Sequence, residues 1–318
     1  MATTGTMNDD NFRLARRGAL GRLAAIGALL MTNAQGTSAA GARPIVRRAI
    51  PRSGEAVPVI GLGTWQTFDV GSAESARAQL REVLERFVEY GGTLVDSSPM
   101  YGRAEGVVGD LAHDLGIQDK LFYATKVWTT GAESGVRQMK ESFRRMRVQR
   151  MDLMQIHNLQ DLRTHTQTLE QWKREGLVRY IGITHYHAGA HAELERLVRT
   201  GTYDFVQVNY SLGEREAERR LLPAAQEAGV AVLANRPFGS GGLFRRVRGE
   251  PLPGWAPEIG CASWAQILLK WIISHPAVTC AIPATSNPKH VIDNMAAGLG
   301  PQPDARMRRS MADAFDKL

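Results

Sequence analysis

The chain has 318 residues, of which 43% are hydrophobic and 22% are charged. This composition is ordinary for a globular protein, and the length allows a large core without stabilising disulfides or metals. Its only cysteines, Cys261 and Cys280, lie in apolar runs, so we expect two buried thiols rather than a required disulfide. Residues 1–42 hold four arginines and two acids, which leaves 35 basic and 30 acidic residues in 43–318. This small basic excess is spread over helices and favours a solvated surface over a nucleic-acid-binding patch.

The first 42 residues have the organisation of an export signal. Arg16-Arg17 precedes an apolar run over residues 18–31, and the small residues Ala40-Gly41-Ala42 follow. The run is too short to span a bilayer comfortably as a mature helix. The arginine pair and the glycine-containing run indicate the twin-arginine route, although the usual Phe-Leu does not follow. We expect cleavage after Ala42, a periplasmic location and no stable membrane insertion; an uncleaved anchor helix after a disordered tail is the alternative.

Short apolar or β-branched runs alternate with helical stretches throughout residues 43–318, as expected for strands buried on both faces. Helices are predicted over residues 74–90, 133–146, 188–199 and 216–228, several of which end at glycine. The predicted strands are Val59–Trp65, Thr93–Ser98, Leu121–Val127, Met151–His157, Val178–Thr184, Phe205–Ser211, Val230–Arg236 and Thr279–Thr285.

Eight strand–helix units in one chain predict an α/β fold, a single-domain (β/α)8 TIM barrel over residues 43–318. An open, doubly wound sheet is the alternative, and it would favour a glycine-rich fingerprint after its first strand. Gly61-Leu62-Gly63 lacks the third glycine and the helix start of that fingerprint. Residues 44–58 are predicted to form a hairpin that covers the barrel floor, and residues 301–318 an additional amphipathic helix.

Four polar residues lie near the carboxyl ends of three consecutive predicted strands, where barrel enzymes place their working groups. They are Asp96, Tyr101, Lys126 and His157. Each alone has a purely structural interpretation: a loop cap, a packed aromatic, a snorkelling lysine and a satisfied core histidine. Together they suit acid catalysis. A nearby ammonium is expected to lower the pKa of a tyrosine, a carboxylate keeps that ammonium charged, and a histidine orients a carbonyl.

At these residues the chain resembles the aldo/keto reductase family, over about residues 55–298. The matching segments occur in the family's order. They are Gly61-Leu62-Gly63-Thr64-Trp65, Val95-Asp96-Ser97-Ser98-Pro99-Met100-Tyr101-Gly102, Ala124-Thr125-Lys126-Val127-Trp128, Asp152-Leu153-Met154-Gln155-Ile156-His157, Gly182-Ile183-Thr184, Val206-Gln207-Val208-Asn209-Tyr210, residues 236–243 and residues 282–294.

The resemblance implies a catalytic tetrad of Asp96, Tyr101, Lys126 and His157. Tyr101 would donate a proton as hydride arrives from the nicotinamide, Lys126 and Asp96 would tune Tyr101, and His157 would orient the carbonyl. Trp65 and Trp128 fall where the family lines its substrate pocket, with packing at the barrel mouth as their alternative role.

The same resemblance implies a nicotinamide cofactor, with NADP(H) favoured and NAD(H) possible. The family usually holds the carboxamide with Ser-Asn after the fifth strand, where this chain has Thr184-His185, and with a glutamine, here Gln207. Where many members stack an aromatic ring on the nicotinamide, the aligned residue is Asn235, or Arg236 with a one-residue slip. The other cofactor contacts that we expect are Gly63, Thr64, Arg236, Pro237, Phe238, Ser240, Gly242, Thr285, Ser286, Asn287, His290 and Asn294.

Two of these regions carry specific expectations. The glycine-rich loop 239–242 offers N–H groups suited to pyrophosphate. At the adenosine end, members that prefer the 2′-phosphate often place lysine or arginine, whereas this chain offers Ser286, Asn287, Lys289 and His290.

The favoured function is therefore NAD(P)H-dependent reduction of an aldehyde or ketone, a small-molecule carbonyl whose identity the sequence does not give. A non-catalytic nucleotide-binding barrel acting as a redox sensor or regulatory subunit is the alternative. His185, His187 and His191 raise a zinc hypothesis and a metal-dependent hydrolase, but no Cys or Glu completes a known spacing, so we expect no metal. The oligomeric state cannot be read from the sequence.

Overall fold

Eight parallel strands form the centre of the computed structural model, which describes residues 44–318. Strands adjacent in sequence are adjacent in the sheet, and bridges from Ile60 to Ala281 and from Gly63 to Ala284 join the first strand to the last. The sheet is therefore a closed barrel, which confirms the predicted (β/α)8 architecture over the open sheet. The leader predicted over residues 1–42 lies outside the described residues. The barrel strands are β3 (Leu62–Gly63), β4 (Leu94–Asp96), β5 (Phe122–Val127), β6 (Met151–His157), β7 (Val178–His185), β8 (Phe205–Asn209), β9 (Ala231–Asn235) and β10 (Val278–Ala281).

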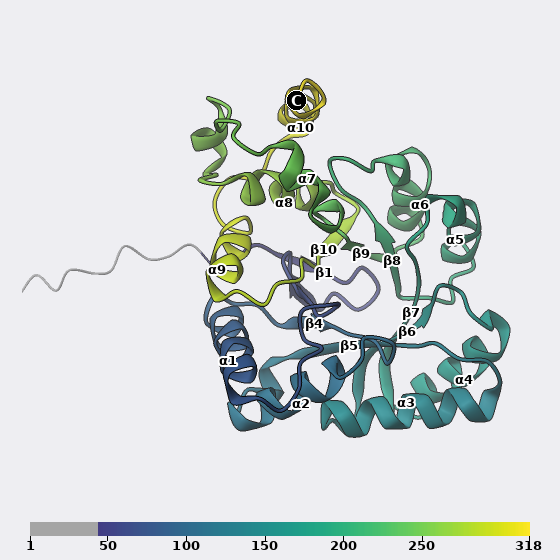
Figure 1. Cartoon of the computed structure of the whole chain (residues 1–318). Coiled ribbons are helices and arrows are strands. Elements are labelled where there is room, and N and C mark those ends of the chain that lie inside the picture. Colours follow the sequence, from purple (N-terminus) through teal and green to yellow (C-terminus); the bar gives the residue numbers. More distant parts are fainter. Residues whose placement is uncertain (1–43) are drawn as a thin grey trace, which may run out of the picture. The chain divides into compact units, whose positions relative to one another are not determined.

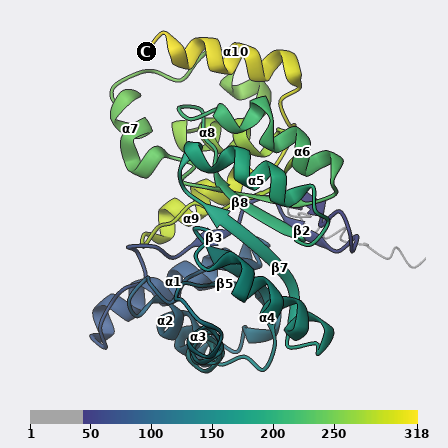
Figure 2. The ribbon, with the colours of Figure 1, turned by 90° about the vertical axis from the view of Figure 1, so that its right-hand side faces the viewer.

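Helices connect successive strands and surround the barrel (Figures 1 and 2). Two predicted helical stretches begin with a 3-10 turn, at residues 188–190 before α5 and at residues 216–219 before α6. The helices are α1 (Glu74–Glu89), α2 (Ala104–Asp114), α3 (Ala132–Met146), α4 (Leu162–Arg174), α5 (His191–Val198), α6 (Leu221–Glu227), α7 (Gly242–Arg246), α8 (Trp264–Ile273), α9 (Pro288–Ala296) and α10 (Ala305–Asp316).

The predicted hairpin is formed by β1 (Arg47–Ala49) and β2 (Ala56–Pro58). Ile50 and Val57 of this hairpin belong to the buried cluster inside the barrel, which includes Phe122 and Phe205. Arg48 fixes the hairpin by donating to the backbone carbonyls of His275, at 2.6 Å, and of Val278. The hairpin thus closes the amino-terminal end of the barrel with apolar side chains, as expected.

The interior changes from apolar to polar along the strands. Side chains alternate between the two faces of a strand, so residues two apart point into the barrel at successive levels. On four strands an apolar residue of the lower level is followed two positions later by a polar residue of the upper level. The pairs are Leu94 and Asp96, Ala124 and Lys126, Leu153 and Gln155, and Phe205 and Gln207, and all eight side chains are buried. The upper level places these four polar groups together near the carboxyl ends of the strands.

The carboxyl-terminal segment forms the additional amphipathic helix that the sequence predicts. Helix α10 buries Met311 and Phe315, and the indole of Trp271 on α8 donates to the carbonyl of Arg308 at 3.1 Å. Cys261 and Cys280 are free and buried, which confirms the expected thiols. Within residues 44–318, no helix combines the length and apolar character needed to cross a membrane.

Candidate active site

A cavity of about 680 Å³ opens at the carboxyl ends of the strands. Asp96, Tyr101 and His157 line it, together with Trp65 and Trp128. The loops and strand ends thus bring together residues that lie up to 92 positions apart in the chain. Lys126 lies beneath the cavity, fully buried, on the neighbouring strand β5.

A buried ion pair forms the base of this group. The Lys126 Nζ donates to Asp96 Oδ2 at 2.6 Å and to the backbone carbonyl of Ser97 at 2.7 Å. The side chains of Lys126 and Asp96 are 0% and 3% exposed. The same Nζ lies 5.1 Å from the centroid of the Tyr101 ring. The structure therefore places the predicted carboxylate, ammonium and phenol in one contiguous set.

The ion pair keeps Lys126 charged. Burial lowers the pKa of this lysine. The opposing effect of Asp96, of Tyr101 and of the hydrogen bonds to both is larger, so the pKa is raised overall. A charged lysine that is fully removed from water requires such a partner.

The pKa of Tyr101 shifts in the direction opposite to the sequence expectation. Burial raises it above its usual value and outweighs the lowering effect of Lys126, while the charge of Asp96 adds to the rise. The expectation of a lowered pKa was wrong because it omitted desolvation of the phenolate and the partial neutralisation of Lys126 by Asp96. The phenol is consequently protonated at neutral pH, which is the form that an acid needs.

His157 faces Tyr101 across the cavity, with ring centroids 6.0 Å apart in an edge-on arrangement. Burial, Lys126 and His185 lower the pKa of His157 to about 3, so the imidazole is neutral near pH 7. Its Nδ1 lies 3.1 Å from the Ser98 Oγ, which also accepts from the Met100 N–H at 3.4 Å. If the Ser98 hydroxyl donates to Nδ1, the ring carries its proton on Nε2 and can donate there.

Two glutamines that project into the barrel complete the surroundings of Asp96. The Gln155 Nε2 and the Gln207 Nε2 both donate to Asp96 Oδ1, at 3.0 and 2.9 Å. Gln207 Nε2 also donates to Gln155 Oε1 at 3.3 Å, and Asn235 Nδ2 donates to Gln207 Oε1 at 3.4 Å. Sequence analysis gave Gln155 no role; its inward position two residues before His157 is the signal that could have identified it.

Several exposed apolar side chains lie at the rim of the cavity. Trp65 is 43% exposed and Trp128 is 40% exposed, and both line the cavity as predicted. Met100, Tyr186 and Phe244 are exposed large apolar side chains that also line it, and sequence analysis did not select them. This rim offers contact surface to the apolar part of a small molecule whose polar end reaches Tyr101 and His157.

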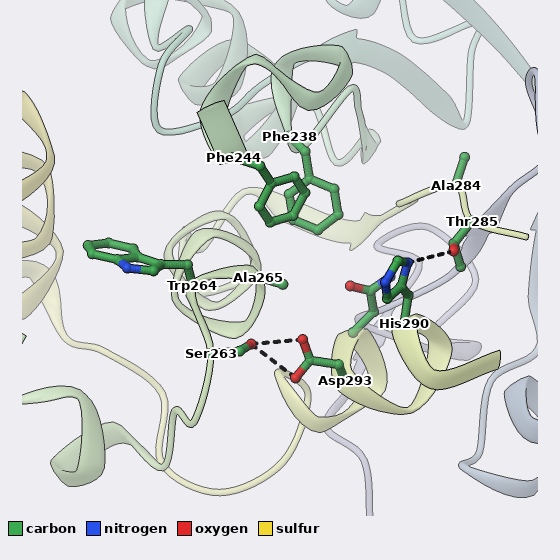
Figure 3. A pocket seen from close by; sticks show the side chains of 10 residues that line it. Phe238, Phe244, Ser263, Trp264, Ala265, Ala284, Thr285, His290 and Asp293 are labelled. Atoms are coloured by element: carbon green, nitrogen blue, oxygen red, sulfur yellow. Dashed lines mark hydrogen bonds between the residues drawn. The ribbon is translucent and has the colours of Figure 1, made fainter. Parts of the chain in front are cut away.

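A second cavity of about 360 Å³ adjoins the first, and both are lined by Phe238, Phe244 and Ala284. The rings of Phe238 and Phe244 lie 4.6 Å apart on one side, opposite His290 and Thr285 (Figure 3). Thr285, His290 and Asn294, which were predicted to contact cofactor, line this second cavity. Together the two cavities provide an elongated space that ends near the amino terminus of α9.

Asp293 also lines the second cavity and was not among the predicted contacts. Its carboxylate accepts from Ser263 Oγ, at 2.8 Å to the nearer oxygen, and from Gln266 Nε2 at 2.6 Å (Figure 3 shows the serine contacts). Both donors come from the start of α8, so these contacts join α8 to α9 at the edge of the cavity.

The other predicted cofactor contacts divide into two groups. Gly63, Thr64, Thr184, Gln207, Arg236, Pro237, Phe238 and Ser240 line the larger cavity. His185, Gly242, Ser286 and Asn287 line neither cavity.

The side chains of His185 and Asn287 have local partners instead. The His185 ring stacks on Tyr186, with centroids 5.7 Å apart, and its Nδ1 accepts from the His187 N–H at 3.1 Å. Asn287 caps α9 by accepting from the Lys289 N–H at 3.0 Å. Within the described part of the chain, no group of three or more His, Cys, Asp or Glu side chains is arranged to hold a metal ion.

Unusual backbone conformations gather at the mouth. Arg236 and Ser240 have φ values of 49° and 53°, in the left-handed region that disfavours residues with a side chain. The Arg236 guanidinium donates to Ser240 Oγ at 3.1 and 3.2 Å, which holds the loop after β9 in this shape. Backbone strain of this kind typically lies at ligand-binding sites. The loop thereby presents a cationic group and a hydroxyl to the larger cavity.

Comparison with known proteins gives one consistent result. Residues 59–310 match the model of the aldo/keto reductase family. The chain is 32% identical over 260 residues to methylglyoxal reductase YeaE of Escherichia coli (strain K12), covering 79% of this chain and 89% of that protein. Two solved aldo/keto reductase structures from Klebsiella pneumoniae, in complex with NADP and acetate and with NADPH, are each 28% identical. Their TM-scores are 0.70 and 0.71, and the matches cover 82% and 86% of this chain and 93% and 95% of those chains.

Proposed function

Because the chain belongs to the aldo/keto reductase family, we propose that it reduces an aldehyde or ketone to an alcohol with NADPH as hydride donor. The observation that carries this proposal is the buried Asp96–Lys126 pair beneath a protonated Tyr101 in an accessible cavity. The four residues to which the resemblance assigns acid catalysis lie close together at this cavity, and this supports the proposal. A non-catalytic nucleotide-binding barrel would have no use for this buried charged group, whose desolvation is costly.

Tyr101 is the proton donor in this proposal. When bound, NADPH supplies the hydride that forms the new C–H bond of the alcohol. The Tyr101 hydroxyl transfers its proton to the carbonyl oxygen as negative charge develops there, and the phenolate regains a proton from solvent. Lys126 stabilises that phenolate through its positive charge.

His157 orients the substrate. A neutral imidazole with its proton on Nε2 donates one hydrogen bond to the carbonyl oxygen without competing with Tyr101 as an acid. Tyr101 and His157 would thus both donate to the carbonyl oxygen, in the same cavity that Thr184 and Gln207 line.

The described residues fit a dinucleotide in outline. The Gln207 NH₂ donates to Asp96 and Gln155, and its Oε1 accepts from Asn235. The second lone pair of this Oε1 and the Thr184 hydroxyl would therefore be the groups that accept from the nicotinamide carboxamide. Asn235 lines the same cavity, and its buried Oδ1 has no hydrogen-bond partner within the described chain. Arg236 and Ser240 would hold pyrophosphate, and His290 and Asn294 would hold the adenosine end.

The test combines turnover with binding. The purified protein is expected to oxidise NADPH in the presence of at least one member of a panel of aldehydes and ketones, and to bind NADPH more tightly than NADH in a fluorescence titration. Tight NADPH binding without turnover on any carbonyl would contradict the reductase and favour the regulatory alternative. Equal or weaker binding of NADPH would correct only the cofactor preference.

We propose in addition that residues 1–42 direct export by the twin-arginine route, with cleavage after Ala42 and a periplasmic destination. Support comes from Arg16-Arg17, the apolar run and Ala40-Gly41-Ala42. A folded, cofactor-loaded enzyme suits a pathway that carries folded cargo. Replacement of Arg16 and Arg17 by lysine is expected to abolish the periplasmic pool in cell fractionation, and the mature amino terminus by mass spectrometry should be Arg43. An undiminished periplasmic pool in the lysine variant would contradict the route.

A further inference from the structure

The side chains of Gln155, Gln207 and Asp96 form a closed triangle of hydrogen bonds inside the barrel. Gln155 Nε2 and Gln207 Nε2 both reach Asp96 Oδ1, and Gln207 Nε2 also reaches Gln155 Oε1. None of the three side chains is accessible to more than a trace of solvent, since their residues are 0%, 2% and 2% exposed. Water therefore cannot replace these contacts easily.

The orientation of the Gln155 amide follows from its neighbours. If the amide were turned over, its oxygen would face the Asp96 carboxylate and its NH₂ would face the Gln207 NH₂, so both contacts would become repulsive. The observed orientation satisfies both. Asp96 and Gln207 thus allow only one orientation of the Gln155 amide.

The triangle determines where the second oxygen of Asp96 points. Oδ1 is occupied by two donors, which leaves Oδ2 for Lys126 Nζ at 2.6 Å. Lys126 in turn lies beneath the Tyr101 ring, and its charge partly offsets the effect of burial on the phenol. A change in Asp96 would therefore reach Tyr101 through Lys126.

We propose that Gln155 is a positioning residue for the reaction, which holds the ionised Asp96 in the rotamer that pairs with Lys126. The kinetic test of this inference rests on the proposed function, whereas its structural test uses the cofactor-free protein and does not. Gln155 is a better test residue than Gln207, because Gln207 also lines the cavity whereas Gln155 does not.

Gln155→Met retains an unbranched side chain of similar length but removes the donor. We expect kcat to fall by about 10- to 100-fold, the loss of one buried hydrogen bond to a charged group. The KM for the carbonyl and the Kd for NADPH should change by less than about threefold, because Gln155 lines neither cavity and Gln207 keeps its hydrogen bond to Asp96. Leu153→Met, one interior level below on the same strand, is the matched control for altered packing and should retain wild-type kcat.

Gln155→Glu gives a signature that a purely structural role would not produce. When protonated, the new carboxyl can donate to Asp96 as the amide does, but when ionised it repels Asp96. The activity of this variant, relative to wild type, is expected to rise as the pH is lowered and to fall to or below that of Gln155→Met as the pH is raised. Gln155→Met should show no such recovery at low pH.

A crystal structure of cofactor-free Gln155→Met separates this inference from the reductase proposal. We expect Asp96 to leave its rotamer or to lengthen its contact with Lys126 beyond hydrogen-bonding distance. Two results would overturn the inference: an unchanged Asp96–Lys126 contact in that structure, or wild-type kcat in Gln155→Met. Absence of carbonyl turnover by the wild-type protein would overturn the reductase alone, because the crystallographic result does not depend on activity.

Discussion

The two sides of the barrel mouth are built differently. On the side of β4 to β6, Asp96, Lys126 and His157 project from strands, are buried, and each have a side-chain hydrogen bond: Lys126 to Asp96, and His157 to Ser98. On the side of β9 and β10, the corresponding groups belong to loops, and Arg236 and Ser240 have left-handed backbone conformations. The comparison indicates that the barrel strands position the charged pair beneath Tyr101, whereas loop conformation shapes the side proposed to bind the cofactor. Substitutions on the first side should therefore have larger effects than those on the second.

The largest effect is expected for Lys126→Met, which leaves Asp96 buried without its cation. Loss of one partner of a buried pair typically costs about 3–5 kcal/mol of unfolding free energy. Loss of the charge beneath Tyr101 should also lower kcat by about 100-fold or more. Urea unfolding and NADPH oxidation measure the two effects.

The double variant Asp96→Asn/Lys126→Met is the control for this prediction. Removing both charges should restore a substantial part of the stability, because the uncompensated carboxylate is gone, but should not restore kcat. A single variant as stable as wild type would show that the buried pair does not organise this side of the mouth.

The pH dependence of stability tests the burial of His157. Its pKa is about 3 in the folded protein, below the value of about 6.5 for unfolded histidine. Below pH 6.5 the unfolded state therefore binds more protons, so this residue makes stability fall as the pH is lowered from 6.5 towards 3. The slope of one such group is about 1.4 kcal/mol per pH unit.

His157→Gln removes that titration while keeping a side chain that can donate a hydrogen bond. The difference in unfolding free energy between the wild type and this variant, measured in urea from pH 4 to pH 6, should change with about the slope of a single group. Parallel pH profiles for the two proteins would mean that His157 titrates normally. The wild-type kcat should likewise show no break near pH 6.5 from this residue.

The smallest effect is expected on the cofactor side, for His290→Arg at the second cavity. A fixed positive charge should strengthen NADPH binding by about fivefold, as an exposed charge-assisted contact to the 2′-phosphate contributes about 1 kcal/mol. Binding of NADH should not change, which makes it the internal control in a fluorescence titration. Equal tightening for both dinucleotides would place His290 away from the 2′-phosphate.

The difference between strand residues and loop residues also explains which features of the site could be predicted from the sequence. Strand ends in a parallel barrel meet at one edge, so the spacing of Asp96, Lys126 and His157 was enough to predict that they converge. The direction of the Tyr101 pKa shift was not predictable from residue types, because residue types do not show how deeply the phenol is buried, and burial here outweighs the nearby ammonium. Gln155 was overlooked because a glutamine in an apolar strand carries no motif of its own.

Loop side chains were harder to predict. His185 is the last residue of β7, yet its ring stacks on Tyr186 and does not line the cavity. The Asn287 side chain caps α9 instead of lining either cavity. Position along the chain indicates which residues reach the mouth, but the local hydrogen-bond partners decide which way each side chain points.

The central claim, that Tyr101 is the proton donor of a carbonyl reductase, is tested most directly by a single turnover. The protein is saturated with NADPH and mixed with an excess of an aldehyde that the wild type reduces, and the loss of NADPH absorbance is followed at neutral pH. Tyr101→Phe should bind NADPH as tightly as wild type and should react about 10²- to 10⁴-fold more slowly, the usual contribution of a positioned general acid. Equal rates for the two proteins, with equal cofactor binding, would contradict the account.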